Sequence, residues 1–268
     1  MEDIRVAAVV CRSPVGKISD NIDRVRTWAG AAAHRGAAVV CFPELNLTGY
    51  TTRPEIADIA ERVPGPASEE VLKIATDTGA VILAGLAERA SDGRIYASHL
   101  SAFPSGDLAV YRKLHIAVPE QPVFSAANDI PLFKAAGVAF GIQLCYDVHF
   151  PELCAHMALK GAEVIFIPHA SPRGNPYEKY ISWMRHLPAR AYDNSLYIIA
   201  CNQGGDNGRG LDLPGIAMAF DPSGNLIAKK IDGEEGLLVV DLSASEFERI
   251  RSHKLGFFLP HRRPEIYR

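Results

Sequence analysis

Short apolar runs alternate with amphipathic stretches along the whole chain, and several of these runs are apolar on both faces. Residues 37–42 and 163–167 are the clearest cases. A strand with apolar side chains on both faces has to be covered by a layer on each side. With 48% hydrophobic residues, the chain has enough apolar material for such layers. The alternation predicts one α/β (or α+β) domain with mixed sheets, spanning residues 1–268.

The expected elements follow the period of the apolar residues. Strands are expected at residues 4–10, 37–42, 80–85, 95–103, 108–112, 140–144, 163–167 and 196–201. Runs at 216–220, 225–230 and 237–240 are expected to be antiparallel neighbours, with a Pro-Ser-Gly turn between the first two. Helices are expected at 18–35, 68–78, 151–160, 177–193 and 243–252, before an extended tail rich in Pro and Arg.

Charge and composition exclude several classes of function. The formal net charge of −3 and the lack of a basic block argue against a nucleic-acid partner. No apolar run approaches the ~18 residues that span a bilayer, so we expect no membrane partner. The five cysteines form no CxxC pair, and the N-terminus lacks a signal-peptide pattern, which favours a cytoplasmic protein without a disulfide framework. The nine histidines match no common metal motif, so we expect neither a metal nor another cofactor.

Cys145 follows an apolar run, and Pro151 begins a helix a few residues later. The thiol is therefore expected at a strand-to-helix turn, where a nearby helix N-terminus and any close cation favour the thiolate. This placement suits a nucleophile. A buried structural cysteine is an equally good interpretation of this segment alone.

Two other apolar strands also end in a reactive group. Glu44 follows the run at 37–42, and Lys113 follows the run at 108–112. If these strands and the Cys145 strand are neighbours in one sheet, the three groups meet at one edge. Lysine would stabilise a thiolate and an oxyanion, and the carboxylate would act as general base and then as general acid. Taken singly, Glu44 and Lys113 fit surface positions better; the combination favours an active site.

These residues resemble the signature blocks of a known family, the nitrilase superfamily of carbon–nitrogen hydrolases. The blocks are Phe42-Pro43-Glu44-Leu45, Tyr111-Arg112-Lys113-Leu114-His115, and Cys145-Tyr146-Asp147 with Phe150-Pro151-Glu152. Weaker likeness is found at Arg190-Ala191 with Asn194, at Asn202-Gln203-Gly204 and at residues 262–267. The resemblance therefore runs over essentially the whole chain.

The resemblance implies a four-layer α-β-β-α sandwich and a homodimer or larger homo-oligomer, with the C-terminal tail, about residues 253–268, in the dimer interface. It also implies a catalytic triad of Glu44, Lys113 and Cys145. Glu120 fits the second active-site glutamate that the family often shows, and it would orient Lys113 or the substrate amide.

The implied reaction is hydrolysis of a small carboxamide to an acid and ammonia through a thioester on Cys145, with no cofactor. Lys113 and the backbone N–H of Tyr146 would hold the oxyanion. Tyr146-Asp147 stands where nitrile-cleaving members commonly have Trp-Glu, which favours the amide-cleaving branches. N-carbamoyl amidohydrolases remain open, nitrilases fit less well, and a non-catalytic binding relative is the alternative from another class. A cysteine peptidase would need a histidine partner in a family-like block, and no such block is present.

Five residues are candidates for the substrate pocket. Tyr50 and Phe150 would wall it, together with Tyr146 beside the nucleophile. His149 stands where many related sequences have an arginine, so a preference for carboxylates does not transfer directly. Arg173 follows a strand end and would reach an anionic group of a substrate.

Overall fold

The apolar runs form two mixed sheets. The first contains β1 (Ile4–Val10), β2 (Val39–Cys41), β3 (Val81–Arg89), β4 (Ile95–Ala102), β5 (Leu108–Arg112) and β14 (Gly236–Leu242). The second contains β6 (Phe133–Ala135), β7 (Val138–Ile142), β8 (Val164–His169), β9 (Tyr197–Asn202), β12 (Gly215–Phe220) and β13 (Leu226–Gly233). The computed structural model describes residues 1–266, and within them the strand orders are β14-β1-β2-β3-β4-β5 and β13-β12-β9-β8-β7-β6.

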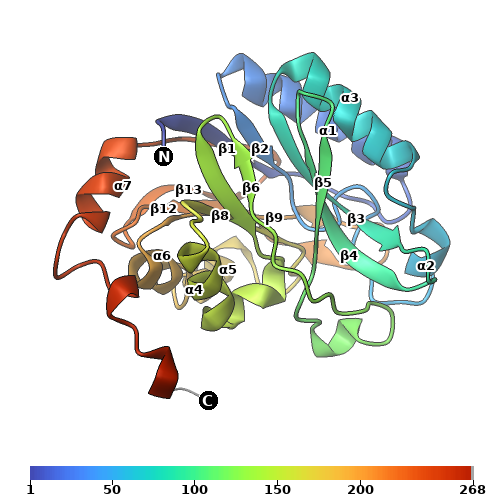
Figure 1. Ribbon diagram of the computed structural model, residues 1–268. Helices are drawn as coiled ribbons and strands as arrows, with labels where there is room; N and C mark the ends of the chain where they lie inside the picture. The colour runs from blue at the N-terminus through green and yellow to red at the C-terminus, as the bar shows by residue number, and fades with distance from the viewer. Residues whose placement is uncertain (267–268) are drawn as a thin grey trace.

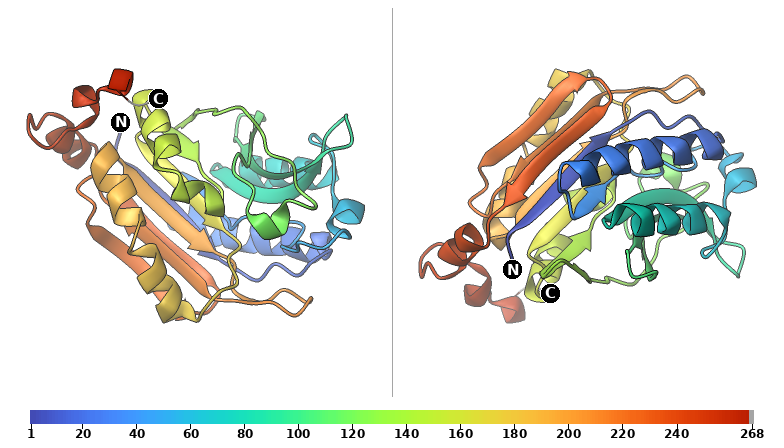
Figure 2. Two further views of the ribbon diagram at one scale, coloured as in Figure 1. Left: turned by 90° about the horizontal axis from the view of Figure 1, so that it is seen from below. Right: turned by 90° about the horizontal axis from the view of Figure 1, so that it is seen from above.

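Helices cover the outer face of each sheet. The helices α1 (Ile18–His34) and α3 (Pro66–Thr78) lie on the first sheet, and α4 (Pro151–Leu159), α5 (Pro176–Trp183) and α6 (Leu187–Asn194) lie on the second (Figures 1 and 2). The described part of the chain thus has the predicted α-β-β-α layers. The short α2 (Ile56–Ile59), β10 (Gly205–Asp206) and β11 (Asp212–Leu213) leave no periodic signal in the sequence. α7 (Ala244–Arg251) follows β14.

The strand β1 shows why the sheets need a layer on each side. Ala7 and Val9 point outward into a core shared with α1 and α3. Val6 and Val10 point inward into the larger core between the two sheets. Full burial of one such aliphatic side chain contributes about 1.5–3 kcal/mol, so both faces of the strand stabilise the sandwich.

The stretch expected to be a single helix at 177–193 is two helices. Pro188 lies in the first turn of α6. A proline has no N–H to donate to the carbonyl four residues earlier, and its ring would clash with that carbonyl, here the one of Met184. The helix α5 therefore ends at Trp183, and a new helix begins at Leu187.

The predicted pairing of the last three strands is right for two of them. β12 and β13 form an antiparallel hairpin, in which the Asp221 side chain accepts a hydrogen bond from the Ser223 amide at 2.9 Å. The run at 237–240, however, belongs to β14 and pairs antiparallel with β1 in the other sheet. This pairing places Leu238, Val240 and Leu242 against the core between the sheets.

The tail after α7 runs away from the sandwich (Figure 1). The sequence predicted an extended tail. The tail is instead partly folded into short 3-10 turns at Leu259–His261 and Pro264–Ile266. Leu255 in this segment is 86% exposed. The dimer contact expected for residues 253–268 stays a prediction, and residues 267 and 268 lie outside the described part.

A glycine in β3 allows the segment after β2 to pass close to the sheet. A Cβ on Gly85 would lie 2.4 Å from the Leu45 nitrogen and 2.9 Å from Nδ1 of His99. The Asn46 side chain accepts a hydrogen bond from the Gly85 amide at 2.7 Å. Gly85 therefore fixes the path of the chain just after Glu44.

We expect Gly85→Ala to lower the free energy of unfolding by roughly 1–3 kcal/mol, because the added methyl group overlaps backbone atoms. Gly30→Ala is the matched control. Gly30 is exposed in the interior of α1 with no atom within 4 Å of an added Cβ, so alanine should stabilise the helix by about 0.5–1 kcal/mol. Urea denaturation of both variants tests this, and equal effects would contradict the close approach at Gly85.

Candidate active site

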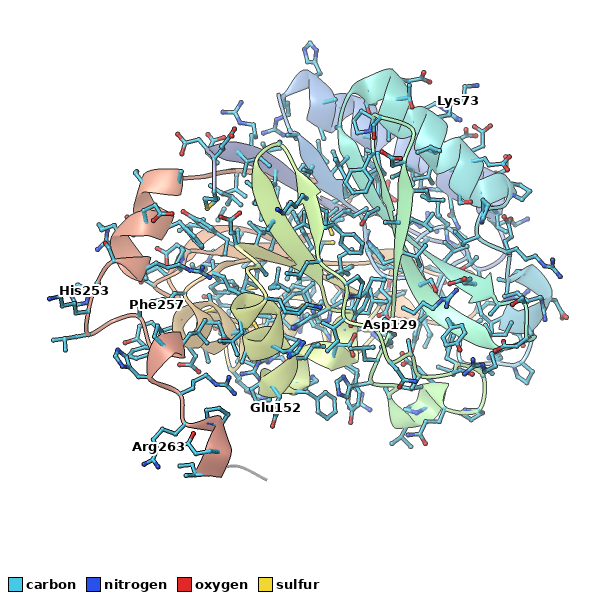
Figure 3. All side chains as sticks on the ribbon, viewed as in Figure 1. Lys73, Asp129, Glu152, His253, Phe257 and Arg263 are labelled. Carbon is cyan, nitrogen blue, oxygen red and sulfur yellow. The ribbon has the colours of Figure 1, made fainter. Side chains whose placement is uncertain are left out.

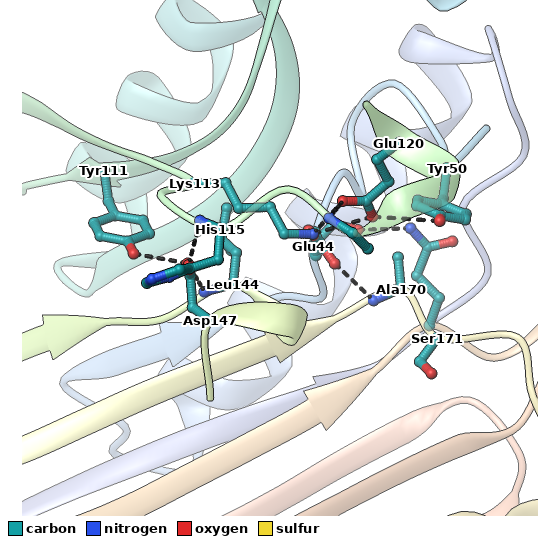
Figure 4. Close-up of polar contacts among 12 residues, drawn as sticks. Glu44, Tyr50, Tyr111, Lys113, His115, Glu120, Leu144, Asp147, Ala170 and Ser171 are labelled. Atoms are coloured by element: carbon teal, nitrogen blue, oxygen red, sulfur yellow. Dashed lines mark hydrogen bonds and ion pairs between the residues drawn. The ribbon is translucent and has the colours of Figure 1, made fainter. Parts of the chain in front are cut away.

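A buried lysine that follows β5 joins two carboxylates, one after β2 and one in the segment after β5. Nζ of Lys113 donates to Oε1 of Glu44 at 2.7 Å and to Oε2 of Glu120 at 2.9 Å (Figure 4). All three side chains are buried. Burial tends to lower the pKa of the ammonium, but the attraction of Glu44 and Glu120 overcomes it and holds the pKa of Lys113 well above its ordinary value. Lys113 is therefore charged.

Glu44 is held from several sides. Its Oε2 accepts a hydrogen bond from the Ala170 amide at 3.1 Å, and its backbone carbonyl accepts one from the Gln203 side chain at 2.7 Å. Burial raises the pKa of Glu44 to about 7, and Glu120 adds to this while Lys113 opposes it. A carboxyl group with this pKa can accept or donate a proton near neutral pH.

Cys145 has a left-handed backbone conformation, with φ of 43°. It directly follows Leu144 and begins a 3-10 helix, Cys145–His149, rather than the α-helix itself. This conformation costs a non-glycine residue roughly 1–2 kcal/mol and is typical of strained functional sites. The sequence therefore placed the cysteine correctly at a sharp turn after a strand.

The expectation that the thiolate is favoured is wrong for the resting protein. Burial raises the pKa of the Cys145 thiol, and Glu44 and Glu120 raise it further. Lys113 lowers it, as predicted, but a single ammonium does not outweigh burial and two carboxylates. Cys145 is therefore a neutral thiol at rest, and its proton has to be removed during any attack.

The three strand ends do not belong to one sheet. Glu44 follows β2 and Lys113 follows β5, which are separated by β3 and β4, whereas Cys145 follows β7 of the opposite sheet. The groups approach one another because the carboxyl ends of these strands lie at the same end of the sandwich. The prediction that the three groups lie together rested on one shared sheet, and that reason does not apply.

Asp147 is a buried carboxylate that the sequence reasoning did not assign. Its Oδ2 accepts hydrogen bonds from the Tyr111 hydroxyl at 2.7 Å and from the Leu144 amide at 3.0 Å. Its Oδ1 lies 2.8 Å from both the amide nitrogen and Nδ1 of His115 (Figure 4). Tyr111 and His115 lie two positions before and two positions after Lys113 in the sequence. This spacing was the signal in the sequence from which their shared contact could have been inferred. Asp147 thus connects the Lys113 strand end to the Cys145 turn.

Cys145 opens into a cavity of about 520 Å³. Glu120 and four of the residues predicted to bind substrate, Tyr50, Tyr146, His149 and Arg173, also line it. The Tyr50 hydroxyl donates to Oε1 of Glu120 at 3.3 Å. Phe150 instead lines a neighbouring cavity, where its ring stacks on His115 with centroids 3.8 Å apart.

Within residues 1–266, no group of three or more His, Cys, Asp or Glu side chains is arranged to hold a metal ion. Over the same residues, no helix has both the length and the apolar character needed to cross a membrane.

Comparisons with known proteins show the family to which this chain belongs. The family model for carbon–nitrogen hydrolases matches residues 5–252. A nitrilase from Pyrococcus abyssi is 30% identical over 98% of this chain and 99% of its own length. An omega-amidase from Xenopus tropicalis is 27% identical over 87% of this chain and 86% of its own length.

A solved structure with a similar fold is that of an amidase variant from Nesterenkonia sp. AN1, in which acrylamide has added to the active-site cysteine. It superposes with a TM-score of 0.84 at 25% identity, over 98% of both chains. Because the family model covers nearly the whole chain, and one relative matches it from end to end, this chain belongs to the carbon–nitrogen hydrolase family.

Proposed function

We propose that this protein is an amidase that hydrolyses a small carboxamide to a carboxylic acid and ammonia through a thioester on Cys145. The observation that carries the proposal is the Lys113 ammonium, which is buried between Glu44 and Glu120 at the end of the sandwich where Cys145 opens into a cavity. These groups supply a nucleophile, an acid–base carboxyl and an oxyanion-binding cation.

The first step is attack of sulfur on the amide carbonyl carbon. Because the thiol is neutral at rest, Glu44 accepts its proton as the S–C bond forms. The carbonyl oxygen becomes an oxyanion, which the Lys113 ammonium and the backbone N–H of Tyr146 stabilise. The pKa of Glu44, about 7, makes it a suitable base in neutral solution.

The tetrahedral intermediate then loses ammonia. Glu44 returns its proton to the departing nitrogen, the C–N bond breaks, and a thioester remains on Cys145. Glu44, ionised again, takes a proton from water as the water oxygen attacks the thioester carbon. The C–S bond breaks, the acid leaves, and the sulfur regains a proton from Glu44.

Glu120 has a supporting part in this scheme. Both of its oxygens lie within 3.0 Å of Nζ of Lys113, and Tyr50 and the Ala117 amide donate to its carboxylate as well. A carboxylate held in this way fixes the ammonium at the place where the oxyanion forms. Glu120 also lines the cavity, where its position suits contact with the substrate amide.

The choice of amides is supported by the Tyr146-Asp147 pair and by two relatives. One is named an omega-amidase, and a cysteine-to-alanine variant of the Nesterenkonia amidase has been solved in complex with butyramide. A nitrile substrate is the second candidate, because the Pyrococcus abyssi relative is named a nitrilase. N-carbamoyl compounds would need the same triad and differ mainly in the contacts of the cavity.

Asp147 acts in this scheme as a positioning residue. Its side chain accepts hydrogen bonds from the amide of Leu144, which directly precedes the nucleophile. It also accepts hydrogen bonds from Tyr111 and His115, which each lie two positions from Lys113. It therefore fixes the relative position of groups carried by opposite sheets. Its negative charge also contributes to the raised pKa of Glu44.

We expect ammonia release from short aliphatic amides by the intact protein, and no release after Cys145→Ala. Cys154→Ala is the matched control, because Cys154 is a buried thiol away from the cavity; that variant should keep most of the activity. Intact-mass measurement should detect the acyl group on the wild-type chain. Ammonia release unchanged by Cys145→Ala would refute the nucleophile, and turnover of nitriles but not amides would refute the amidase.

The pH dependence follows from Glu44. Its carboxyl has to be ionised to accept the thiol proton, so kcat/KM should fall as the pH drops through about 7. Glu44→Gln should lower kcat/KM by about 10²–10⁴-fold and remove this acid limb. Initial rates between pH 5 and 9 test the prediction, and a profile that is flat down to pH 5 would contradict it.

The variants Asp147→Asn and Tyr111→Phe distinguish the effect of the Asp147 charge from the effect of its hydrogen bond with Tyr111. Asp147→Asn should lower kcat and move the acid limb to lower pH, because it removes a negative charge that raises the pKa of Glu44. Tyr111→Phe removes one hydrogen bond to Asp147 without a change of charge, so it should lower kcat less and leave the midpoint in place. Identical profiles for wild type and Asp147→Asn would show that Asp147 has only a structural role.

A further inference from the structure

Another cavity, of about 460 Å³, lies at the end of the first sheet where β3 and β4 meet beside α2 (Figure 1). It shares no lining residue with the Cys145 cavity. Its wall carries four guanidinium groups but only two carboxylates: Arg62, Arg89, Arg94, Arg112, Glu88 and Asp92. The proposed hydrolysis does not explain this excess of positive charge.

Two of the four arginines are paired with the two carboxylates. Nε of Arg112 donates to Glu88 at 2.8 Å, and its Nη2 donates to the other oxygen of the same carboxylate. Nε of Arg94 donates to Asp92 at 2.7 Å. A guanidinium has five N–H donors, so each of these arginines keeps donors that its carboxylate does not engage. The charges of the two pairs cancel, but N–H donors remain for a ligand.

A buried tyrosine ring holds the paired arginines in place. Cζ of Arg112 lies 4.9 Å from the centre of the Tyr96 ring, and Cζ of Arg94 lies 5.3 Å from it. These distances are typical of cation–π contacts. A guanidinium that is already oriented loses less rotamer freedom when it binds an anion. This part of the wall is therefore preorganised.

Arg62 and Arg89 are the cations without a carboxylate partner. They directly follow Glu61 and Glu88, which form a parallel bridge, and the Arg89 amide donates to the Glu61 carbonyl at 2.8 Å. Paired segments lie about 4.8 Å apart, so the two arginines have adjacent backbones. Within residues 1–266 neither forms an ion pair, and the Arg89 side chain donates to the uncharged Ala57 carbonyl. Like charges on neighbouring segments repel, and a bound anion relieves this repulsion.

The wall thus carries two positive charges that its own carboxylates leave unbalanced. A phosphate monoester carries a charge of about −1.5 to −2 near pH 7 and has three strong acceptor oxygens. Arginine matches the geometry of a phosphate with two parallel hydrogen bonds. A carboxylate or a phosphodiester, with one negative charge, would leave one of the two cations unbalanced. The cavity is also large enough for a short carbon chain beside the phosphate.

We propose that this cavity binds the phosphate group of a small phosphate monoester, with Arg62 and Arg89 as the main anchors and Arg94 and Arg112 as further donors. The inference does not depend on the proposed amidase function, because no residue of the cavity takes part in that reaction.

Calorimetry with glycerol 3-phosphate tests the proposal. At pH 8 this probe is a dianion, because the second pKa of a phosphate monoester is about 6. Low salt limits screening of the charges. The wild-type protein should bind glycerol 3-phosphate at least about 10-fold more tightly than dimethyl phosphate, which has one negative charge. Inorganic phosphate should compete for the same site.

Variants locate the binding in the protein. Arg62→Gln and Arg89→Gln should each raise the Kd for glycerol 3-phosphate by about 10- to 100-fold, as expected for loss of a charge-assisted hydrogen bond. Arg35→Gln and Arg263→Gln are the controls, and their Kd should equal that of the wild type. Arg35 is exposed at the end of α1, and Arg263 lies in the tail, away from α2 (Figure 3). Arg62 is exposed, so its variant stays informative if Arg89→Gln unfolds.

Three results would overturn the phosphate site. The first is no binding of glycerol 3-phosphate to the wild type, or a Kd that Arg62→Gln leaves unchanged. The second is binding lost in Arg173→Gln but kept in Arg62→Gln, which would place the phosphate in the Cys145 cavity. The third is binding to vesicles that contain phosphatidic acid without binding to glycerol 3-phosphate, which would replace the small molecule by a lipid surface.

The phosphate site and the amidase fail independently. Cys145→Ala should bind glycerol 3-phosphate with the Kd of the wild type while it releases no ammonia from amides. Loss of phosphate binding in Cys145→Ala would contradict a separate site. Absence of ammonia from every amide would overturn the amidase, and the calorimetric result would still decide the phosphate site.

Discussion

The Lys113 ammonium, buried between the carboxylates of Glu44 and Glu120, is the interaction on which the rest of the site depends. Each charge would be costly alone in the interior, and removing one member of such a buried set costs about 3–5 kcal/mol. Together with hydrogen bonds from the Ala170 amide and the Tyr50 hydroxyl, the set is well satisfied. The sandwich is therefore stable with its charged groups enclosed.

Enclosure also sets the protonation of these groups. Burial is the main cause of the raised pKa values of Glu44 and Cys145; Glu120 raises both further, and Lys113 opposes the rise in both. In the proposed mechanism this thiol is therefore unreactive until a substrate brings an oxygen on which negative charge can develop. In this arrangement the charge that a thiolate would carry appears only as it is transferred to the bound substrate.

Much of the site was predictable from the sequence because local pattern marks a strand end. Glu44, Lys113 and Cys145 each follow an apolar run, and their resemblance to family blocks grouped them. Pairing between distant segments is not encoded locally, so the location of β14 beside β1 and the separation of the three groups over two sheets were not predicted. Asp147 was missed for the same reason, since its partners on β5 and the following loop lie more than thirty positions earlier. The break at Pro188, by contrast, was readable from the sequence and was overlooked.

The distribution of the reactive groups over two sheets has a consequence for biosynthesis. During translation the first sheet's Glu44, Lys113 and Glu120 leave the ribosome before Cys145, and the contacts that join Glu44 to Ala170 and Gln203 span 126 and 159 positions. Contacts of such sequence separation form late in folding. A partly synthesised chain that lacks β8 and β9 lacks the contacts of Ala170 and Gln203 with Glu44, so the nucleophile and base of the proposed mechanism are fully positioned only after most of the polypeptide has been made. The proposed hydrolytic activity thus depends on an architecture that is nearly complete.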